Sequence, residues 1–144
     1  MRQLSSRIVY QNAWMKVRED VVERLDGSTG IYGVVMKPDF AIVVPRGEGG
    51  FWMVDQFRYP IQRRSLEFPM GSWPGEPGGD QEALARTELA EETGLREGER
   101  ALEATELDME HRFVTDAELD ELIASGAVVD SCTVAALALY HRAR

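Results

Sequence analysis

The chain has 144 residues, a formal net charge of −9, 44% hydrophobic residues and 28% charged residues. This length predicts one domain, residues 1–144, that buries roughly 68–70% of its unfolded surface without disulfides or metals to hold it together. The acidic balance excludes nucleic-acid polymers as partners, because binding a phosphate backbone requires a surface rich in Lys and Arg.

The cysteine content and the hydropathy indicate a compartment. A single cysteine, Cys132, cannot form an internal disulfide, and it lies in an apolar helical pattern, so we expect a small core residue in a reducing compartment. No apolar run reaches the ~20 residues of a membrane span, and the N-terminus lacks the apolar region of a signal peptide. We therefore expect a cytoplasmic protein that has no membrane partner.

The first 60 residues have the β-branched and aromatic content of strands. The predicted strands are residues 7–10, 14–25, 30–37, 40–45 and 51–57. Asp26-Gly27 and the glycine-rich residues 46–50 are the predicted hairpin turns. This order predicts an antiparallel arrangement at the start of the chain.

A loop and an acidic helix follow. Residues 67–79 (EFPMGSWPGEPGG) hold glycines and prolines that let a ligand approach the backbone closely. Asp80 is the predicted N-cap of a short helix with Ala85 and Leu89 as its apolar stripe, and Gly94 is the predicted C′ residue.

Three carboxylates of this helix, Glu88, Glu91 and Glu92, are close together. Residues three and four apart on a helix have Cβ atoms ~5–6 Å apart, so the three form one acidic patch. A hard cation such as Mg²⁺, held by carboxylates, waters and substrate phosphates, turns the repulsion between them into binding. The alternative is a solvated helix face, which is the ordinary meaning of a Glu-rich turn.

The C-terminal part predicts two more helices. Thr115 and Glu118 form a capping box for a helix that runs to about residue 125, where Gly126 ends it. Asp130 or Ser131 caps the last helix. The residues predicted to share one face of that helix are Val134, Leu137, Ala138 and His141. The two histidines, His111 and His141, have no metal-ligand spacing, and we expect structural or surface roles for them.

Residues 87–95 (TELAEETGL) resemble the Nudix box, whose core is Arg-Glu-aliphatic-x-Glu-Glu-x-Gly-aliphatic. The positions of Glu88, Glu91 and Glu92 match, as do both aliphatic positions and the glycine. Thr87 stands where the box has Arg, and Gly79 stands where it has its first Glu. The resemblance implies that Glu88, Glu91 and Glu92 are catalytic metal ligands, with Mg²⁺, or alternatively Mn²⁺, as the cofactor.

Residues 55–60 (DQFRYP) and 66–71 (LEFPMG) look like the ADP-ribose pyrophosphatase branch of that family. By this resemblance, Arg58 contacts a substrate phosphate or ribose, Glu67 holds a second metal, the Met70 carbonyl is a metal ligand, and Gly71 belongs to the substrate loop. The alternatives are a strand-edge arginine kept for solubility, and a glutamate that is paired with Arg58, Arg63 or Arg64. Those three arginines also place positive charge near the expected diphosphate.

The family likeness implies an α+β fold, a Nudix-like α/β/α sandwich with a mixed sheet and an N-terminal antiparallel sheet. In the ADP-ribose branch such a sheet, here within residues 1–45, serves dimerisation, so we expect a homodimer, with Trp14 at the interface or in an ordinary packed strand. Residues 96–114 leave room for one strand where family members have more, and Glu106 is the candidate for the catalytic loop carboxylate.

The resemblance implies Mg²⁺-dependent hydrolysis of the diphosphate linkage of a nucleoside diphosphate derivative, ADP-ribose or a nucleotide sugar. The alternative is a catalytically weak or inactive Nudix-like module that binds a nucleotide metabolite and regulates a partner. Thr87, Gly79 and the short span after Leu95 favour this alternative.

Overall fold

The computed structural model describes residues 1–72, 80–93 and 108–143, and within the helix of the Nudix-like box it describes the side chains of residues 82–89. These residues form two compact units. The first contains Met1–Asp39, and the second contains Phe40–Gly71 together with the described residues after position 79. The single domain expected from the chain length stays a prediction.

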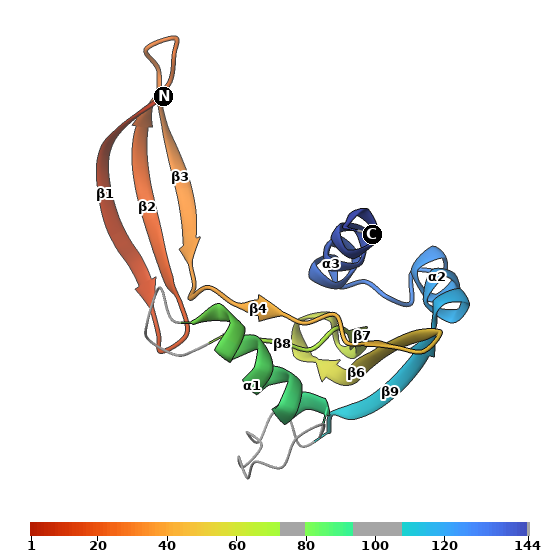
Figure 1. Cartoon of the computed structure of the whole chain (residues 1–144). Coiled ribbons are helices and arrows are strands. Elements are labelled where there is room, and N and C mark those ends of the chain that lie inside the picture. The colour runs from red at the N-terminus through yellow and green to blue at the C-terminus, as the bar shows by residue number, and fades with distance from the viewer. Residues whose placement is uncertain (73–79, 94–107, 144) are drawn as a thin grey trace. The chain divides into compact units, whose positions relative to one another are not determined.

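The first unit is a three-stranded antiparallel sheet (Figure 1). Its strands are β1 (Arg2–Gln11), β2 (Lys16–Glu23) and β3 (Thr29–Met36), in that spatial order. The β2–β3 turn is the predicted one: Gly27 has a φ of 82°, and the Asp26 side chain accepts a hydrogen bond of 3.0 Å from the Ser28 amide. A left-handed φ at this turn is cheap only for glycine. The N-terminal antiparallel sheet is therefore confirmed.

Trp14 was expected within the second strand, and this boundary was wrong by two residues. Trp14 lies in the connection between β1 and β2, where its amide donates to Asn12 Oδ1 at 2.9 Å and the Met15 amide donates to the same oxygen at 2.8 Å. A side chain that takes over the backbone amides in this way ends the strand ladder. The Trp14 residue is 73% exposed.

The second unit is built around one long strand, β6 (Gly50–Arg58), which pairs with three others. Its partners are β5 (Arg46–Gly47), β7 (Arg63–Glu67) and β9 (Glu110–Thr115), and a short 3-10 helix, η1 (Tyr59–Ile61), connects β6 to β7. A separate pair joins β4 (Ala41–Ile42) to β8 (Met70–Gly71). The pairings among the described strands are antiparallel. The strand predicted over residues 40–45 is only Ala41–Ile42 in the structure. Beyond it, the Val43 amide donates one hydrogen bond to the Pro69 carbonyl, and the Pro45 carbonyl accepts one from the Trp52 amide.

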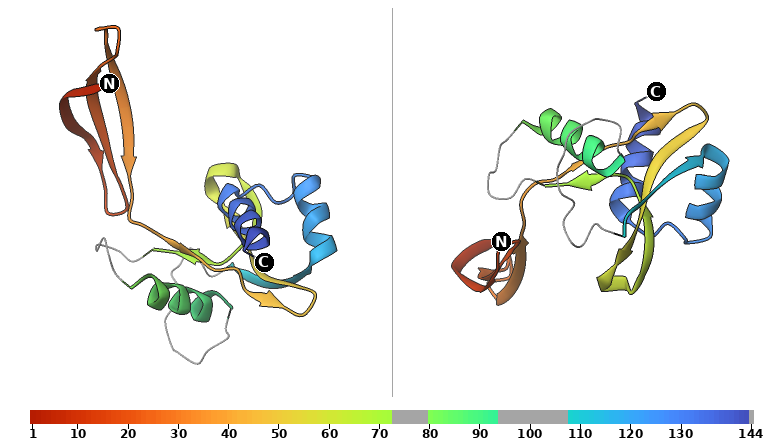
Figure 2. Two further views of the ribbon diagram at one scale, coloured as in Figure 1. Left: turned by 45° about the horizontal axis from the view of Figure 1, so that its top comes forward. Right: turned by 90° about the horizontal axis from the view of Figure 1, so that it is seen from below.

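Helices lie on both sides of these strands (Figures 1 and 2). Helix α1 (Gln81–Thr93) packs against β4, β6 and β8 on one side. Helices α2 (Asp116–Ala124) and α3 (Ser131–Arg142) cover the other side. The hydrophobic core between sheet and helices contains Phe51, Met53, Leu66, Phe68, Val114, Leu119, Val128, Ala136 and Leu137. This order of layers is that of the predicted sandwich.

All three predicted helix caps are present. The Asp80 side chain accepts from the Glu82 and Ala83 amides at 3.0 and 3.2 Å. The Thr115 hydroxyl accepts from the Glu118 amide at 3.2 Å, and the Asp130 carboxylate accepts from the Thr133 amide at 2.6 Å. Each satisfies amide groups that a helix start leaves without partners. The predicted end of α2 is also confirmed, since Gly126 follows with a φ of 74°. In the described ranges, no helix is both long and apolar enough to cross a bilayer.

The buried face of α3 differs from the shared face that the sequence indicates. Thr133, Ala136 and Leu137 are buried, whereas Val134, Ala138 and His141 of the predicted face are exposed. The sequence of α3 is apolar on most sides, so its periodicity does not select a face. Cys132 was expected in the core and is half-buried beside it. The apolar stripe of α1 likewise centres on the buried Leu84, while Ala85 and Leu89 are half-buried.

Candidate functional site

The predicted loop and the predicted acidic helix meet where the Glu88 carboxylate lies against the backbone of Gly71. A Cβ atom at position 71 would stand 2.1 Å from Cδ and Oε2 of Glu88, and 2.3 Å from Oε1. Van der Waals contact between heavy atoms lies at ~3.5–4.0 Å, so only a glycine leaves room for the carboxylate. The glycine of the loop and the first glutamate of the box therefore form one local unit.

The chemistry of this place fits a hard divalent cation. Mg²⁺ is bound in proteins through carboxylates and carbonyl oxygens, and it usually keeps several waters. Met70, whose carbonyl is the predicted metal ligand, shares the two-residue strand β8 with Gly71, next to which Glu88 lies. The side chains of Glu91 and Glu92 lie outside the described residues, as does Glu106. Within the described ranges, no group of three His, Cys, Asp or Glu side chains is gathered as for a metal ion.

A second charged feature is the ion pair between Arg58 and Glu67. Arg58 Nε donates to Oε1 and Oε2 of Glu67 at 3.0 and 3.1 Å, and Arg58 Nη2 also contacts Oε2. The side chain of Glu67 is only 4% exposed, whereas that of Arg58 is 39% exposed. The sequence left open whether Glu67 holds a metal or pairs with an arginine, and in this structure Arg58 is its partner.

Strand register places this pair within a polar strip, which we define as Gln56, Arg58, Ser65 and Glu67. Glu67 lies opposite Val54, Ser65 opposite Gln56, and Arg63 opposite Arg58. Residues opposite each other or two apart share one face of a sheet. The strip therefore lies on the face away from the core residues of β6 and β7, which is the side of α1. Ser65 is 1% exposed, and its hydroxyl has no hydrogen-bond partner among the described residues.

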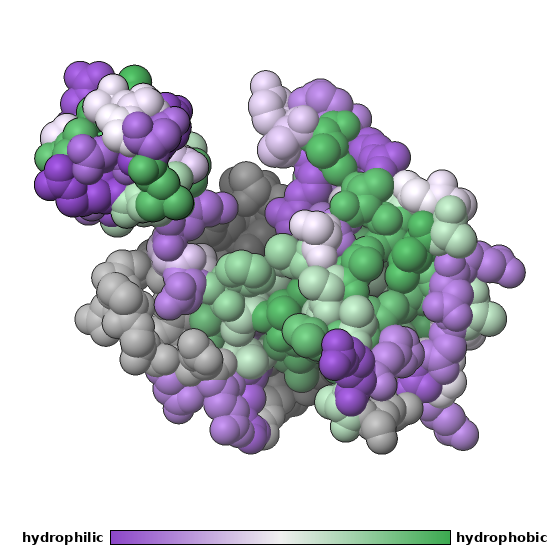
Figure 3. Space-filling view, turned by 90° about the horizontal axis from the view of Figure 1, so that it is seen from above, coloured by the Kyte–Doolittle hydropathy of each residue, from purple (hydrophilic) through white to green (hydrophobic). Residues whose placement is uncertain are grey.

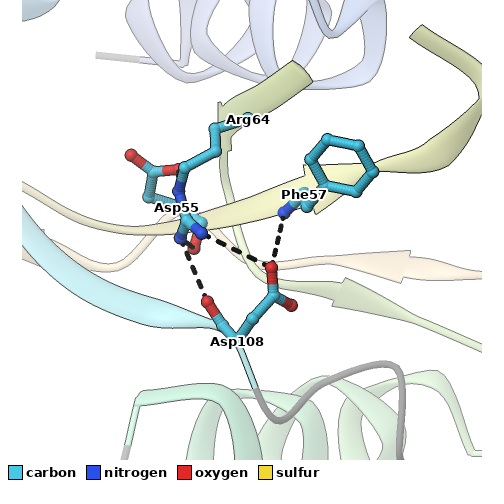
Figure 4. A network of polar contacts seen from close by, with 4 residues as sticks. All are labelled: Asp55, Phe57, Arg64 and Asp108. Atoms are coloured by element: carbon cyan, nitrogen blue, oxygen red, sulfur yellow. Dashed lines mark hydrogen bonds and ion pairs between the residues drawn. The ribbon is translucent and has the colours of Figure 1, made fainter. Parts of the chain in front are cut away.

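Arg64 takes part in a network that the sequence did not suggest (Figure 4). Its Nε donates to Asp55 Oδ1 at 2.8 Å and its Nη2 donates to the Asp55 carbonyl at 2.6 Å. Its Nη2 also donates to the Asp108 carbonyl at 3.1 Å, and the Asp108 carboxylate accepts from the Phe57 amide at 3.2 Å. Asp108 thus extends the bonding of β6 to a residue that precedes β9, two positions before its first residue, Glu110. By strand alternation, Arg64 faces away from Arg58, so the structure separates arginines that the sequence grouped together.

The two charged features are close along the chain. Met70 follows Glu67 by three residues, and three residues span at most ~10 Å of extended backbone. The structure therefore places the Glu88 carboxylate against Gly71, whose neighbour in β8 is Met70, while Glu67 is the last residue of β7, three residues before Met70. Their roles as metal and substrate ligands stay predictions.

Comparison with known proteins gives three findings. Residues 1–35 match the family model described as the nucleoside diphosphate sugar hydrolase N-terminal domain. A solved structure, "Crystal structure of ADP compounds hydrolase", matches 97% of this chain and 91% of its own with a TM-score of 0.78 at 16% sequence identity. At that identity the match shows the fold, and it confirms the predicted α+β class with its N-terminal antiparallel sheet.

The third finding concerns sequence. A methanol dehydrogenase activator of Bacillus methanolicus is 32% identical over 87 residues, which are 60% of this chain. The match spans 46% of the activator, so this chain corresponds to about half of that relative's length. The family-model match over residues 1–35 agrees with the predicted relationship, and the structural match shows the fold.

Proposed function

We propose that this chain, a protein of the Nudix family that resembles the ADP-ribose pyrophosphatase branch, hydrolyses the diphosphate linkage of a nucleoside diphosphate derivative with the help of Mg²⁺. The observation that carries the proposal is the position of the Glu88 carboxylate against Gly71. This contact joins the helix of the Nudix-like box to the loop before the helix. If the box is functional, a metal-bound diphosphate has to lie at this junction of loop and helix.

The residues of the chain have distinct roles in the proposed reaction. Glu88, with Glu91 and Glu92, would hold the metal, and the Met70 carbonyl would complete the ligands. When bound, the cation would supply positive charge to the phosphate oxygens, on which negative charge develops during substitution at phosphorus. Gly71 leaves space for the carboxylate and for the close approach of the substrate. Glu106 is the proposed base that takes the proton of the attacking water.

Two further residues would act on substrate binding. Arg58 presents a planar fork of donors that matches phosphate geometry, and it would fix the diphosphate in line with the attacking water. Glu67 would hold a second metal ion. Its negative charge suits this role, and the metal ion would then replace Arg58 as the cation next to this buried carboxylate.

ADP-ribose or a nucleotide sugar is the proposed substrate class. Support comes from the motif around Arg58 and Glu67, from the family model that matches residues 1–35, and from the printed name of the structural neighbour. The test is incubation with ADP-ribose and with several nucleotide sugars, with Mg²⁺ and with EDTA, followed by chromatography of the products. Nucleoside monophosphate released only with Mg²⁺ supports the proposal, and unchanged substrates under every condition contradict it.

A regulatory module is the second candidate, and a specific observation favours it. The sequence relative is an activator of another enzyme, and Thr87 replaces the arginine of the box in this chain. Such a module would bind ADP-ribose without turnover. Calorimetric binding of ADP-ribose that leaves the ligand intact after hours with Mg²⁺ would support the module, whereas product formation would support the enzyme.

A homodimer is the proposed assembly in the cytoplasm. The sheet of the first unit exposes large apolar side chains, with Ile31 at 66% and Val35 at 60%, and isolated sheets of few strands need such residues covered. The second unit also presents a broad hydrophobic area on the side seen in Figure 3. Sedimentation velocity tests the assembly: we expect a dimer for the wild type and more monomer for Trp14→Ser, while a monomer at all concentrations contradicts the proposal.

A further inference from the structure

Arg58 and Glu67 form an ion pair in the structure, whereas in the proposed function Arg58 binds the diphosphate and Glu67 holds a metal ion. Glu67 is nearly fully buried, and the Nε and Nη2 atoms of Arg58 contact both of its carboxylate oxygens. A buried carboxylate is stable only beside a cation or with full hydrogen bonding. In this structure the guanidinium is that cation.

The ion pair between Arg58 and Glu67 excludes the contacts proposed for them, which are those of Glu67 with a metal ion and of Arg58 with a phosphate. A carboxylate that is gripped on both oxygens by Nε and Nη2 has little room for a metal ion. A guanidinium whose Nε and Nη2 donors are bonded to a carboxylate cannot donate the same hydrogen bonds to a phosphate. Arg58 can therefore bind the substrate through these donors only when another cation binds Glu67 in its place.

Arg63 places a second positive charge next to Arg58. It lies directly opposite Arg58 in the β6–β7 pairing, and like charges at such positions repel each other. Arg63 is exposed, and Arg58 is partly exposed at the end of β6. The Arg63 guanidinium itself is engaged, since its Nη2 donates to the Gly126 carbonyl at 3.4 Å, so the charge that a released Arg58 offers to an anionic diphosphate would be its own.

We propose that Arg58 is the stand-in cation of Glu67, and that a divalent metal ion competes with it for this carboxylate. Metal binding at Glu67 releases the Arg58 guanidinium to the anionic substrate, so that metal and substrate bind cooperatively. This inference rests on the proposed function of the site. A purely structural ion pair predicts no such competition, because its loss would not improve the binding of any ligand.

The first experiment measures Mg²⁺ alone, without substrate. The melting temperature of the wild type, Arg58→Met and Arg63→Met is followed against Mg²⁺ concentration, which gives an apparent dissociation constant by mass action. We expect Arg58→Met to bind Mg²⁺ at least about fivefold more tightly, a typical size for coupling between two ligands. Arg63→Met removes the same charge nearby and should bind as the wild type does. Equal or weaker binding by Arg58→Met overturns the inference.

The second experiment avoids the unpaired buried carboxylate, which could keep Arg58→Met from folding. Glu67→Gln keeps the shape of the side chain and weakens its hold on Arg58. We expect calorimetry in EDTA at fixed salt to show that Glu67→Gln binds inorganic pyrophosphate at least about fivefold more tightly than the wild type. The double variant Arg58→Met/Glu67→Gln should lose the gain. Pyrophosphate binding by Glu67→Gln that is no tighter than in the wild type overturns the inference.

These results separate the inference from the function on which it rests. A wild type that turns over ADP-ribose with Mg²⁺, together with unchanged Mg²⁺ affinity in Arg58→Met, overturns the exchange and leaves the hydrolase standing. A wild type whose melting temperature does not respond to Mg²⁺ and that forms no product overturns both.

Discussion

Replacing Gly71 by alanine tests whether the Glu88 carboxylate acts at the site. The new Cβ would stand 2.1 Å from Cδ and Oε2 of Glu88. A carboxylate pushed back to an ordinary contact of ~3.5 Å has to move by about 1.4 Å. Gly71 lies in strand β8, outside the left-handed region, so alanine suits the backbone and the side chain of Glu88 takes up the displacement.

A shift of this size should damage catalysis far more than stability. A misplacement of ~1 Å in an active site costs up to about 10²-fold in rate, which corresponds to about 2.7 kcal/mol. Because the displaced atoms are the end of a flexible side chain, the loss of folding free energy should stay at the low end of the ~1–3 kcal/mol typical of overpacking. We therefore expect Gly71→Ala to lose about 10²-fold in kcat/KM for ADP-ribose and to melt within a few degrees of the wild type.

The matched control is Gly33→Ala. Gly33 lies in strand β3, and a Cβ there would meet nothing within 4 Å. Both kcat/KM and melting temperature should match those of the wild type. If Gly71→Ala retains full Mg²⁺-dependent activity, the Glu88 carboxylate at this position has no part in the reaction.

Two further predictions concern stability. Thr133→Val should lower the free energy of unfolding in urea by about 1–3 kcal/mol, because the fully buried Thr133 hydroxyl accepts a hydrogen bond of 3.0 Å from the Phe68 amide. Thr133→Ser keeps a hydroxyl and should keep most of the stability. Equal stabilities of the Val and Ser variants would contradict this prediction. A hydrogen bond from Ser6 and the ion pair with Arg18 lower the pKa of Asp20, so its contribution to stability is present above its ordinary pKa of 3.8 and is lost as the pH falls through the lowered value. Melting temperatures from pH 7 to pH 2 should therefore fall less for Asp20→Asn than for the wild type, and parallel curves would show that Asp20 does not contribute.

The features that the sequence predicted correctly are local. The cap at Asp80 involves residues two and three positions away, and the caps at Thr115 and Asp130 each involve a residue three positions away. The turn at Gly27 depends on two or three residues. Short-range hydrogen bonding decides these features, so a motif in the sequence specifies them almost completely.

Features that depend on tertiary packing were predicted less well. The partner of Glu67 was one of three possible arginines, and only the register of β6 and β7 selects Arg58. Arg64 and Asp108 are 44 residues apart, and no local pattern connects them. Apolar residues lie on most sides of α3, so the sequence of the helix does not select a buried face. The contact of α3 with Phe68 selects it.

Hydrolysis of ADP-ribose by Glu88→Gln and Glu82→Gln tests the central claim most directly. Both substitutions remove one negative charge from α1, but Glu82 lies in the first turn, is 75% exposed and pairs with Arg86, whereas Glu88 lies against Gly71. If Glu88 holds the metal, Glu88→Gln should lose at least about 10²-fold of the Mg²⁺-dependent rate while Glu82→Gln keeps it. Equal rates in the wild type and both variants would contradict the claim that this acidic helix holds the catalytic metal.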